Sequence, residues 1–253
     1  MSTNTVAVIT GGNRGLGRAT ALALGEAGTD VVLTYRSNEK QAAEVVDALT
    51  AMGRRAAALP LDTTAFEEFP GFARTLGDTL RATWGRDSFD FLVNNAGTGA
   101  LTPLGATGAE VFDLLVDVHF KGVFFLTQEL LPLLADGGRI VNTSTGLTRF
   151  VGEGWSVYAA AKSAVETYSR YLAQELGPRG ISVNTIAPGP IATDFAGGVV
   201  RDNEGLRTVM ASHAALGRIG EPQDVGAAVA ALLAPGTGWI TGQRVEASGG
   251  TRL

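Results

Sequence analysis

The sequence predicts an α/β fold, with a doubly wound parallel sheet flanked by helices on both faces in a single domain spanning residues 1–253. Short β-branched or apolar runs alternate with longer stretches of helical spacing, which is the pattern of βαβ units. Because these runs are uniformly apolar, we expect helices to cover both faces of the sheet, with right-handed crossovers. No Pro/Ser-rich linker or charge run divides the chain.

Six runs are the expected strands, at residues 6–10, 31–35, 56–61, 89–94, 139–143 and 181–187. A helix is expected over residues 109–134, and apolar side chains cover more of its circumference than one core-facing stripe requires. This helix either packs against a second subunit or is buried in the middle of the sheet. Residues 195–216 follow a Pro-rich turn and have weak periodicity, which predicts a lid over a pocket.

The composition argues against several classes of protein. With 20 basic and 25 acidic residues the chain has no basic stripe for nucleic acid. It contains no cysteine, which excludes disulfides and thiolate metal sites, and its two histidines lack companions, so we expect no bound metal. No leader pattern and no apolar run of roughly 18–20 residues is present, so we expect no membrane association and a cytoplasmic location.

The first expected strand runs directly into a glycine-rich turn, Thr10-Gly-Gly-Asn-Arg-Gly-Leu-Gly17, and then into an amphipathic helix. Glycines allow a tight turn and close backbone approach, and the N–H groups at a helix N-terminus attract an anion such as a pyrophosphate. A purely structural turn is the alternative. The strand before the turn and the helix after it favour a dinucleotide site.

The end of the second strand indicates which dinucleotide binds. An NAD site places an acidic residue there, whereas an NADP site needs positive charge for the 2′-phosphate. Here the strand ends in Tyr35-Arg36-Ser37, and Arg14 lies within the glycine turn, so two guanidinium groups and a hydroxyl favour NADP(H). The alternative is that both arginines are ordinary solvated charges.

Tyr158 and Lys162 are four residues apart at the start of a long helical pattern, which places the phenol and the ammonium on one face. A tyrosine with an ordinary pKa near 10 is a poor acid or base at neutral pH. A neighbouring cation favours the phenolate, so we expect Lys162 to lower the pKa of Tyr158 and make it a usable acid/base.

Four motifs together resemble the short-chain dehydrogenase/reductase family: residues 10–17, Asn-Asn-Ala-Gly at 94–97, Tyr158-x-x-x-Lys162 and Pro188-Gly189. The resemblance extends over essentially the whole chain, and it implies a Rossmann fold and an NADP(H)-dependent oxidoreductase. Such an enzyme moves a hydride between the nicotinamide and the carbonyl or alcohol carbon of a small molecule such as a ketone or aldehyde. The family also implies a homotetramer.

The resemblance implies roles for individual residues. Tyr158 would protonate the substrate oxygen, Lys162 would bind the nicotinamide ribose, and a hydroxyl of Ser144 or Thr145 would orient the carbonyl. The residues expected to bind NADP(H) are Gly11, Asn13, Arg14, Gly15, Leu16, Gly17, Arg36, Ser37, Asp62, Asn94, Ala96, Gly97, Tyr158, Lys162, Pro188, Gly189, Ile191 and Thr193. Asp62 and Asn94 are equally suited to forming turns or caps, and both roles are compatible.

The chain departs from the family pattern at two places. The usual catalytic serine is replaced by Thr145, with Ser144 one residue earlier, and either hydroxyl could serve. His119 stands where the family commonly has an asparagine that helps to hold a water linked to the lysine. His119 is either simply packed or part of a proton relay, and in a relay a pKa near 6.5 would impose a pH dependence.

Three readings of the function stay open. A ketone or aldehyde reductase with a largely apolar pocket, including Phe150, Trp155 and Phe195, is the first. The second is a 3-oxoacyl carrier protein reductase, for which Arg179 supplies one expected basic residue but Asp136 replaces the other. The third is a non-catalytic NADP-binding sensor, against which the intact Tyr158 and Lys162 argue.

Overall fold

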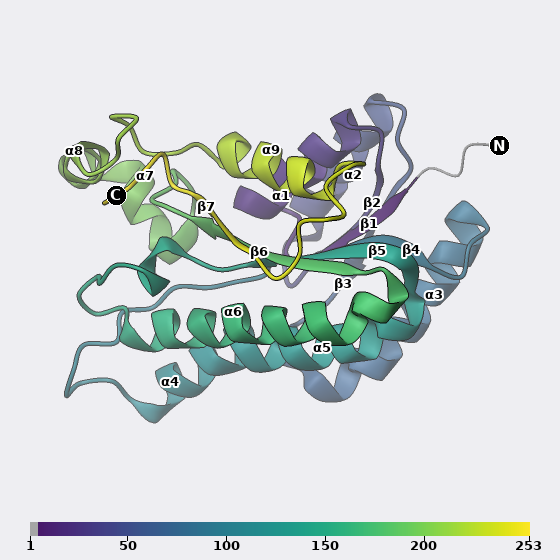
Figure 1. Ribbon diagram of the computed structural model, residues 1–253, viewed down its shortest axis with the longest axis horizontal. Helices are drawn as coiled ribbons and strands as arrows, with labels where there is room; N and C mark the ends of the chain where they lie inside the picture. Colours follow the sequence, from purple (N-terminus) through teal and green to yellow (C-terminus); the bar gives the residue numbers. More distant parts are fainter. Residues whose placement is uncertain (1–4) are drawn as a thin grey trace.

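Seven parallel strands form one sheet in the order β3-β2-β1-β4-β5-β6-β7, as Figure 1 shows. The computed structural model describes residues 5–253, and it confirms the predicted doubly wound α/β fold. The strands are β1 (Val6–Ile9), β2 (Asp30–Tyr35), β3 (Ala56–Pro60), β4 (Phe89–Asn94), β5 (Leu134–Thr143), β6 (Ser182–Pro188) and β7 (Arg244–Ala247). The N-terminal stretch in which we expect no leader begins with residues 1–4, which lie outside the described residues.

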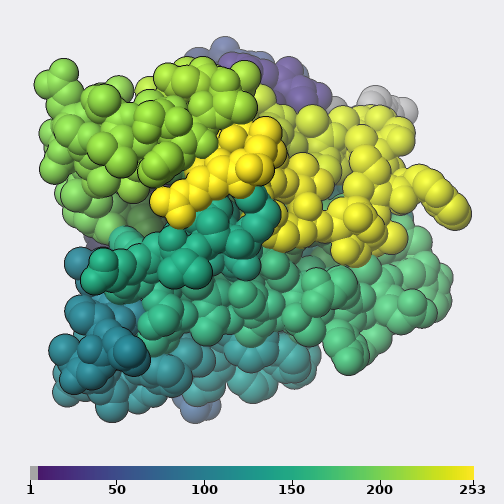
Figure 2. Space-filling view, turned by 60° about the vertical axis from the view of Figure 1, so that its left-hand side comes forward, coloured from purple at the N-terminus to yellow at the C-terminus, as the bar shows by residue number. Residues whose placement is uncertain are grey.

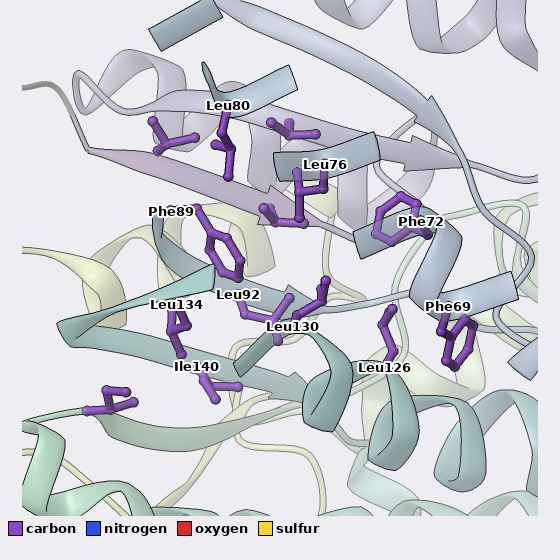
Figure 3. Close-up of a cluster of buried hydrophobic side chains, with 14 of the residues drawn as sticks. Phe69, Phe72, Leu76, Leu80, Phe89, Leu92, Leu126, Leu130, Leu134 and Ile140 are labelled. Atoms are coloured by element: carbon purple, nitrogen blue, oxygen red, sulfur yellow. The ribbon is translucent and has the colours of Figure 1, made fainter. Parts of the chain in front are cut away.

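Helices cover both faces of the sheet. One face carries α1 (Gly15–Glu26), α2 (Glu39–Ala51) and α9 (Pro222–Leu233), and the other carries α3 (Phe69–Trp84), α4 (Ala109–Val116), α5 (Gly122–Leu130) and α6 (Ser156–Leu176). Each layer encloses an apolar cluster, because the strands present Val, Ile, Leu and Phe to both sides. Figure 3 shows one cluster, where Leu76, Leu92 and Leu126 meet from α3, β4 and α5.

The sequence prediction missed two features of the sheet. Strand β7 was not expected, because Arg244 and Glu246 alternate with apolar residues in a four-residue run whose members are only partly buried. Strand β5 begins at Leu134 instead of residue 139, since Leu134 pairs with Phe89 through an irregular register. The Gly137-Gly138 pair within this extension has the composition of a turn.

The helix expected over residues 109–134 is interrupted. A π-helical turn, Asp117–Lys121, separates α4 from α5, and a 3₁₀ turn, Leu131–Leu133, ends the segment before β5. Such π-turns occur often at functional sites. Phe112, Leu114 and Phe125 on this segment stay 48%, 41% and 41% exposed, so the segment is not simply buried in the middle of the sheet.

The segment predicted as a lid folds into short helices, namely a 3₁₀ turn (Phe195–Gly198), α7 (Val199–Asp202) and α8 (Glu204–Ser212). Ala196, Gly197 and Gly198 all have φ between 51° and 79°, in the left-handed region. Ala196 carries a side chain there, which is unfavourable for any residue other than glycine. Across residues 5–253, no helix is both long and apolar enough to span a membrane.

Candidate active site

The predicted site residues gather where the parallel strands end, at their carboxyl edge. The strand order reverses between β1 and β4, and ligands of open α/β sheets bind in the crevice at such a point. Thr10 follows β1, Asn94 ends β4, Ser144 follows β5 and Pro188 ends β6, so segments far apart in the sequence meet at this edge. No cluster of His, Asp or Glu that could hold a metal ion occurs among residues 5–253.

The glycine turn between β1 and α1 has the geometry of an anion cradle. Gly11 and Gly15 have φ of 63° and 53°. A Cβ on Gly17 would lie 2.2 Å from the Gly11 carbonyl oxygen, so only glycine fits there. The first turn of α1, which includes Leu16, contains no acidic residue and receives no side-chain cap, so its N–H groups are available to an anion.

The Asn-Asn-Ala-Gly segment after β4 fixes this turn in place. The Thr10 hydroxyl accepts hydrogen bonds from the backbone N–H groups of Asn95 and Ala96, each at 2.9 Å. The Asn95 amide donates to the carbonyl oxygens of Thr10 and Gly11 at 3.0 and 3.2 Å. Asn95 was not among the individual predictions, although it lies within the predicted motif.

Asn94 points the other way, into the sheet. Its amide donates to Thr127 Oγ1 at 3.0 Å and to Asn142 Oδ1 at 2.8 Å, which links β4 to α5 and β5. Gly97 is needed for a different reason, since a Cβ there would lie 3.0 Å from the ring of His119. The segment therefore connects the nucleotide end of the site to the catalytic end.

Two exposed guanidinium groups lie at the predicted adenosine end. Arg14, Arg36 and Ser37 are exposed, and neither arginine side chain forms a hydrogen bond or a close ion pair with another described residue. Asn13 donates to Gln41 Oε1 at 3.3 Å. This geometry provides two exposed guanidinium groups beside the glycine turn, and one of them, Arg36, interacts with the charge of Asp62.

Asp62 forms a turn, which is one of the two roles expected of it, and its contact with the adenine stays a prediction. Its Oδ1 accepts from the backbone N–H of Thr64 at 2.9 Å and from the Thr64 hydroxyl at 2.7 Å, which forms a turn after β3. Burial opposes ionisation, but these two hydrogen bonds and the charge of Arg36 lower the pKa of Asp62 overall. The carboxylate is thus ionised and close to Arg36.

The end of β6 closes the other side of the cradle. A Cβ on Gly189 would lie 2.7 Å from the Ser248 side chain, and Ile191 forms a bridge with Gly220. The methyl carbon of Thr193 lies 3.8 Å from where a Cβ of Gly15 would be. The structure therefore brings residues 188–193 against the glycine turn, and the open backbone between them fits a dinucleotide.

Tyr158 and Lys162 lie on α6 and are both buried, 7% and 3% exposed. The Thr145 side chain acts on the Tyr158 phenol, because it opposes part of the rise in the pKa of Tyr158. The Lys162 ammonium donates to the carbonyl oxygen of Thr143 at 2.6 Å, and its Nζ lies 6.0 Å from the centre of the Tyr158 ring. The predicted pair is therefore assembled at the end of β5.

The pKa of Tyr158 differs from the expectation. Burial raises it to about 12, and the Thr145 hydrogen bond only partly offsets this. Lys162 does not lower it, because the ammonium is directed at a backbone carbonyl and its own pKa falls to about 7 through burial. The phenol is thus held in its protonated form, which is the form that can donate a proton.

Only one of the two candidate hydroxyls influences the pKa of Tyr158. That hydroxyl belongs to Thr145, whereas Ser144 Oγ donates to Glu166 Oε1 at 2.5 Å. Sequence reasoning missed Glu166. A signal existed, because residues 158, 162 and 166 continue the four-residue spacing along one side of α6.

His119 is fully buried in the π-helical turn. Its Nε2 lies 2.6 Å from the Thr98 carbonyl oxygen, which requires a proton on Nε2, and its Nδ1 has no partner among residues 5–253. Burial, reinforced by the charge of Lys162, lowers the pKa of His119 well below 6.5. The imidazole is neutral, so a relay that titrates near 6.5 is excluded by the burial.

An aromatic wall stands beside Tyr158. The rings of Trp155 and Phe195 are stacked, with centroids 6.0 Å apart and planes at 23°. Both lie 5.6 Å from the ring of Tyr158, and a Cβ on Gly99 would lie 2.7 Å from Phe195. Phe150, expected in the same wall, instead lies beside the guanidinium groups of Arg149 and Arg252.

Comparisons with known proteins agree with this geometry. A family model described as Enoyl-(Acyl carrier protein) reductase matches residues 11–252. The hydroxynaphthalene reductase-like protein Arp2 of Metarhizium brunneum is 35% identical over 257 residues, covering 97% of this chain and 94% of that protein.

Two solved structures are similar over nearly their whole length. One is the promiscuous reductase LugOII, which catalyses keto-reduction at C1 during lugdunomycin biosynthesis (TM-score 0.93, 36% identity, 99% of this chain and 98% of that chain). The other is the landomycin C-6 ketoreductase LanV with bound NADP and rabelomycin (TM-score 0.89, 34% identity, 99% and 97%).

Proposed function

Since the chain belongs to the short-chain dehydrogenase/reductase family and is an oxidoreductase, we propose that it reduces a ketone to an alcohol with NADPH. The observation that carries this proposal is the buried, protonated Tyr158 beside the Thr145 hydroxyl. The phenol carries its proton at neutral pH and lies beside a hydroxyl that can bind the same substrate oxygen, and reduction of a carbonyl needs a proton at that oxygen.

The residues divide the chemistry between them. NADPH, when bound, supplies the hydride that reaches the carbonyl carbon. Tyr158 donates its phenolic proton to the carbonyl oxygen, so that the C=O bond becomes a CH–OH group and the tyrosine is left as a phenolate. Thr145 donates a hydrogen bond to the same oxygen and orients it. Lys162 binds the nicotinamide ribose.

A preference for NADP(H) is supported by the two exposed arginines. Arg14 and Arg36 supply positive charge at the adenosine end, where Ser37 adds a hydroxyl. The remaining cofactor residues follow the family roles. The glycine turn binds the pyrophosphate, and Asp62 binds the adenine. Residues 94–97 contact the ribose, and residues 188–193 contact the carboxamide of the nicotinamide.

We assign the substrate to flat aromatic ketones. Trp155 and Phe195 present ring faces and edges next to Tyr158, and aromatic rings prefer such offset or edge contacts. Arp2 is named as hydroxynaphthalene reductase-like, and hydroxynaphthalene is an aromatic compound, which supports the same assignment. Residues 195–216 serve as the lid over this pocket.

Two rival functions are disfavoured. A 3-oxoacyl carrier protein reductase needs free positive charge for an acidic partner, but Arg179 Nε donates to Asp136 Oδ1 at 2.7 Å and is neutralised within the chain. A non-catalytic NADP sensor has no need for Tyr158, Lys162 and Thr145 together. We also propose a cytoplasmic homotetramer, with the exposed Phe112 and Phe125 facing a second copy.

The test is the loss of NADPH absorbance with acetophenone, 2-tetralone and acetoacetyl-CoA, with NADH run in parallel. We expect NADPH-dependent reduction of the two ketones that contain a benzene ring, and no turnover by Tyr158→Phe with NADPH affinity unchanged. Turnover by the phenylalanine variant would disprove the mechanism, and NADPH binding without turnover of any ketone would favour the sensor. Light scattering near four times 26.1 kDa checks the tetramer.

A further inference from the structure

A cluster of charged residues outside the reacting groups holds the loop after β5. One carboxylate oxygen of Glu166, Oε1, accepts three hydrogen bonds: from Ser144 Oγ at 2.5 Å, from Thr148 Oγ1 at 2.8 Å and from Arg244 Nε at 2.9 Å. The side chains of Glu166 and Arg244 are 13% and 21% exposed. These are strong, charge-assisted contacts in a site with little access to solvent.

The same cluster also grips the backbone of Thr145. Its carbonyl oxygen accepts from Arg244 Nη2 at 3.1 Å and lies 2.9 Å from Thr148 Oγ1, whose single proton is shared between this oxygen and Glu166 Oε1. The neighbouring Ser144 and Thr148 are both held by Glu166 through their hydroxyl groups. Contacts to the residues before and after Thr145 therefore hold the segment that carries the Thr145 hydroxyl, which acts on Tyr158.

The cluster spans three elements that the sequence separates widely. Glu166 lies on α6, two helical turns after Tyr158, and Arg244 lies on β7, the last strand. Arg244 Nη1 also donates to Glu246 at 2.9 Å, and Arg149 at the far end of the loop donates to Glu246 at 2.7 and 2.8 Å.

The end of the chain closes the cluster. Arg149 Nη1 donates to the Arg252 carbonyl oxygen at 2.6 Å, and Arg149 Nη2 donates to that of Thr251. Figure 2 shows the last residues, in yellow, lying against the teal-green loop that follows β5. The helix that carries the tyrosine, the hydroxyl loop and the C-terminal strand are thus joined by one chain of alternating charges.

We infer that Glu166 and Arg244 are positioning residues, which hold the Thr145 hydroxyl against Tyr158 through Ser144, Thr148 and the Thr145 carbonyl. Neither residue contacts the reacting atoms. The inference rests on the proposed reduction, in which Thr145 orients the carbonyl. It also explains why Ser144 is not the orienting hydroxyl, because Ser144 is committed to Glu166.

The alternative is that the cluster only stabilises the fold, and a double-mutant cycle separates the two roles. We expect Glu166→Ala to lower kcat about tenfold for the ketone reduced fastest in the panel above, with the NADPH dissociation constant unchanged within about twofold. In a Thr145→Ala background the same substitution should cause no further loss of kcat. Equal losses in both backgrounds, or no loss in either, would overturn the inference.

Two further variants guard against a folding defect. Glu166→Gln keeps an oxygen that accepts from Ser144 and Thr148, so it should recover most of the kcat lost in Glu166→Ala. Glu175→Gln, an exposed carboxylate on the same helix, is the matched control and should leave kcat unchanged. If Glu166→Ala does not fold, Ser144→Ala takes its place in the cycle, with the same expected dependence on Thr145.

The failure of this inference can be told apart from failure of the proposed function. If Tyr158→Phe retains turnover, the proposed mechanism is wrong. If Tyr158→Phe is inactive while Glu166→Ala keeps the wild-type kcat, only the positioning role is wrong. Melting temperatures of all variants are measured in parallel, since a purely structural role would lower them without the dependence on Thr145.

Discussion

The imidazole of His119 meets the ring of Tyr158 edge-on, with the ring centroids 4.8 Å apart and the planes at 88°. This contact joins the π-helical turn to the catalytic helix α6. It places a neutral group directly against Tyr158, the proposed proton donor, because burial keeps His119 unprotonated. A charged imidazole at this distance would disturb the ionisation of Tyr158, whereas a neutral one packs against it.

We therefore predict that His119 makes no contribution to the pH dependence of the reaction. The profiles of kcat/KM for the wild type and His119→Asn should have the same shape between pH 5.5 and 8.5, because no titration of His119 occurs in this range. Steady-state rates with NADPH and 2-tetralone measure this. A step near pH 6.5 that is present only in the wild type would contradict it. Nitrogen NMR of the wild type provides a control and should show Nε2 protonated and Nδ1 bare.

Lys162 should make the stability of the cofactor-free protein depend on pH. Its pKa is about 7 in the folded chain and near 10.5 in the unfolded chain, so between these values the unfolded chain binds a proton that the folded chain does not. The free energy of unfolding should rise as pH increases from 7 towards 10, with a slope of up to about 1.4 kcal/mol per pH unit, and level off below 7.

Urea unfolding of the wild type and Lys162→Met between pH 6 and 10 tests this. The methionine variant cannot titrate, so its free energy of unfolding should be nearly constant over this range. Tyr158 does not interfere, because its raised pKa affects stability only above pH 10. Parallel curves for the two proteins would show that Lys162 is not the titrating group.

The sequence predicts those parts of the site that depend on a few residues close together in the chain. The glycine turn, with its φ values above 50° at Gly11 and Gly15, and the spacing of Tyr158 and Lys162 on one helix each occupy fewer than ten residues. The βαβ alternation likewise predicts six of the seven strands.

What the sequence could not predict depends on residues far apart in the chain. Glu166 binds the Ser144 hydroxyl, which leaves the Thr145 hydroxyl as the one that acts on Tyr158. Arg244, about a hundred positions after Thr145, holds the backbone of the loop that follows β5. The pKa values of Tyr158 and Lys162 follow from how deeply the fold buries them, and spacing alone carries no information on burial. The same holds for His119.

Replacing the arginines at the adenosine end should change cofactor preference. Arg36→Ala and Arg14→Ala should each raise the KM for NADPH about tenfold or more and leave the KM for NADH within about twofold, because only NADPH carries the 2′-phosphate. Steady-state kinetics with both cofactors measures this. Arg18→Ala, an exposed arginine on α1, is the control and should change neither KM. Equal increases for both cofactors would argue against a phosphate contact.

The contact between Gly99 and Phe195 should set how well the pocket closes. A Cβ on Gly99 would lie 2.7 Å from the Phe195 ring, so Gly99→Ala should push the ring away from Trp155 and Tyr158. We expect kcat/KM for 2-tetralone to fall about tenfold while the KM for NADPH stays unchanged.

The two shortest contacts of this Cβ are with the Phe195 ring and the third is with Ala196 Cβ at 3.2 Å, so in a Phe195→Ala background Gly99→Ala should lose most of its effect on kcat/KM. Gly108→Ala is the matched control, because nothing lies within 4 Å of its Cβ position and the substitution should be silent. If Gly99→Ala causes the same loss with and without Phe195, the alanine acts on the backbone of the 94–99 segment. The segment 195–216 would then have no role in closing the pocket, and its left-handed turn at Ala196 would need another explanation.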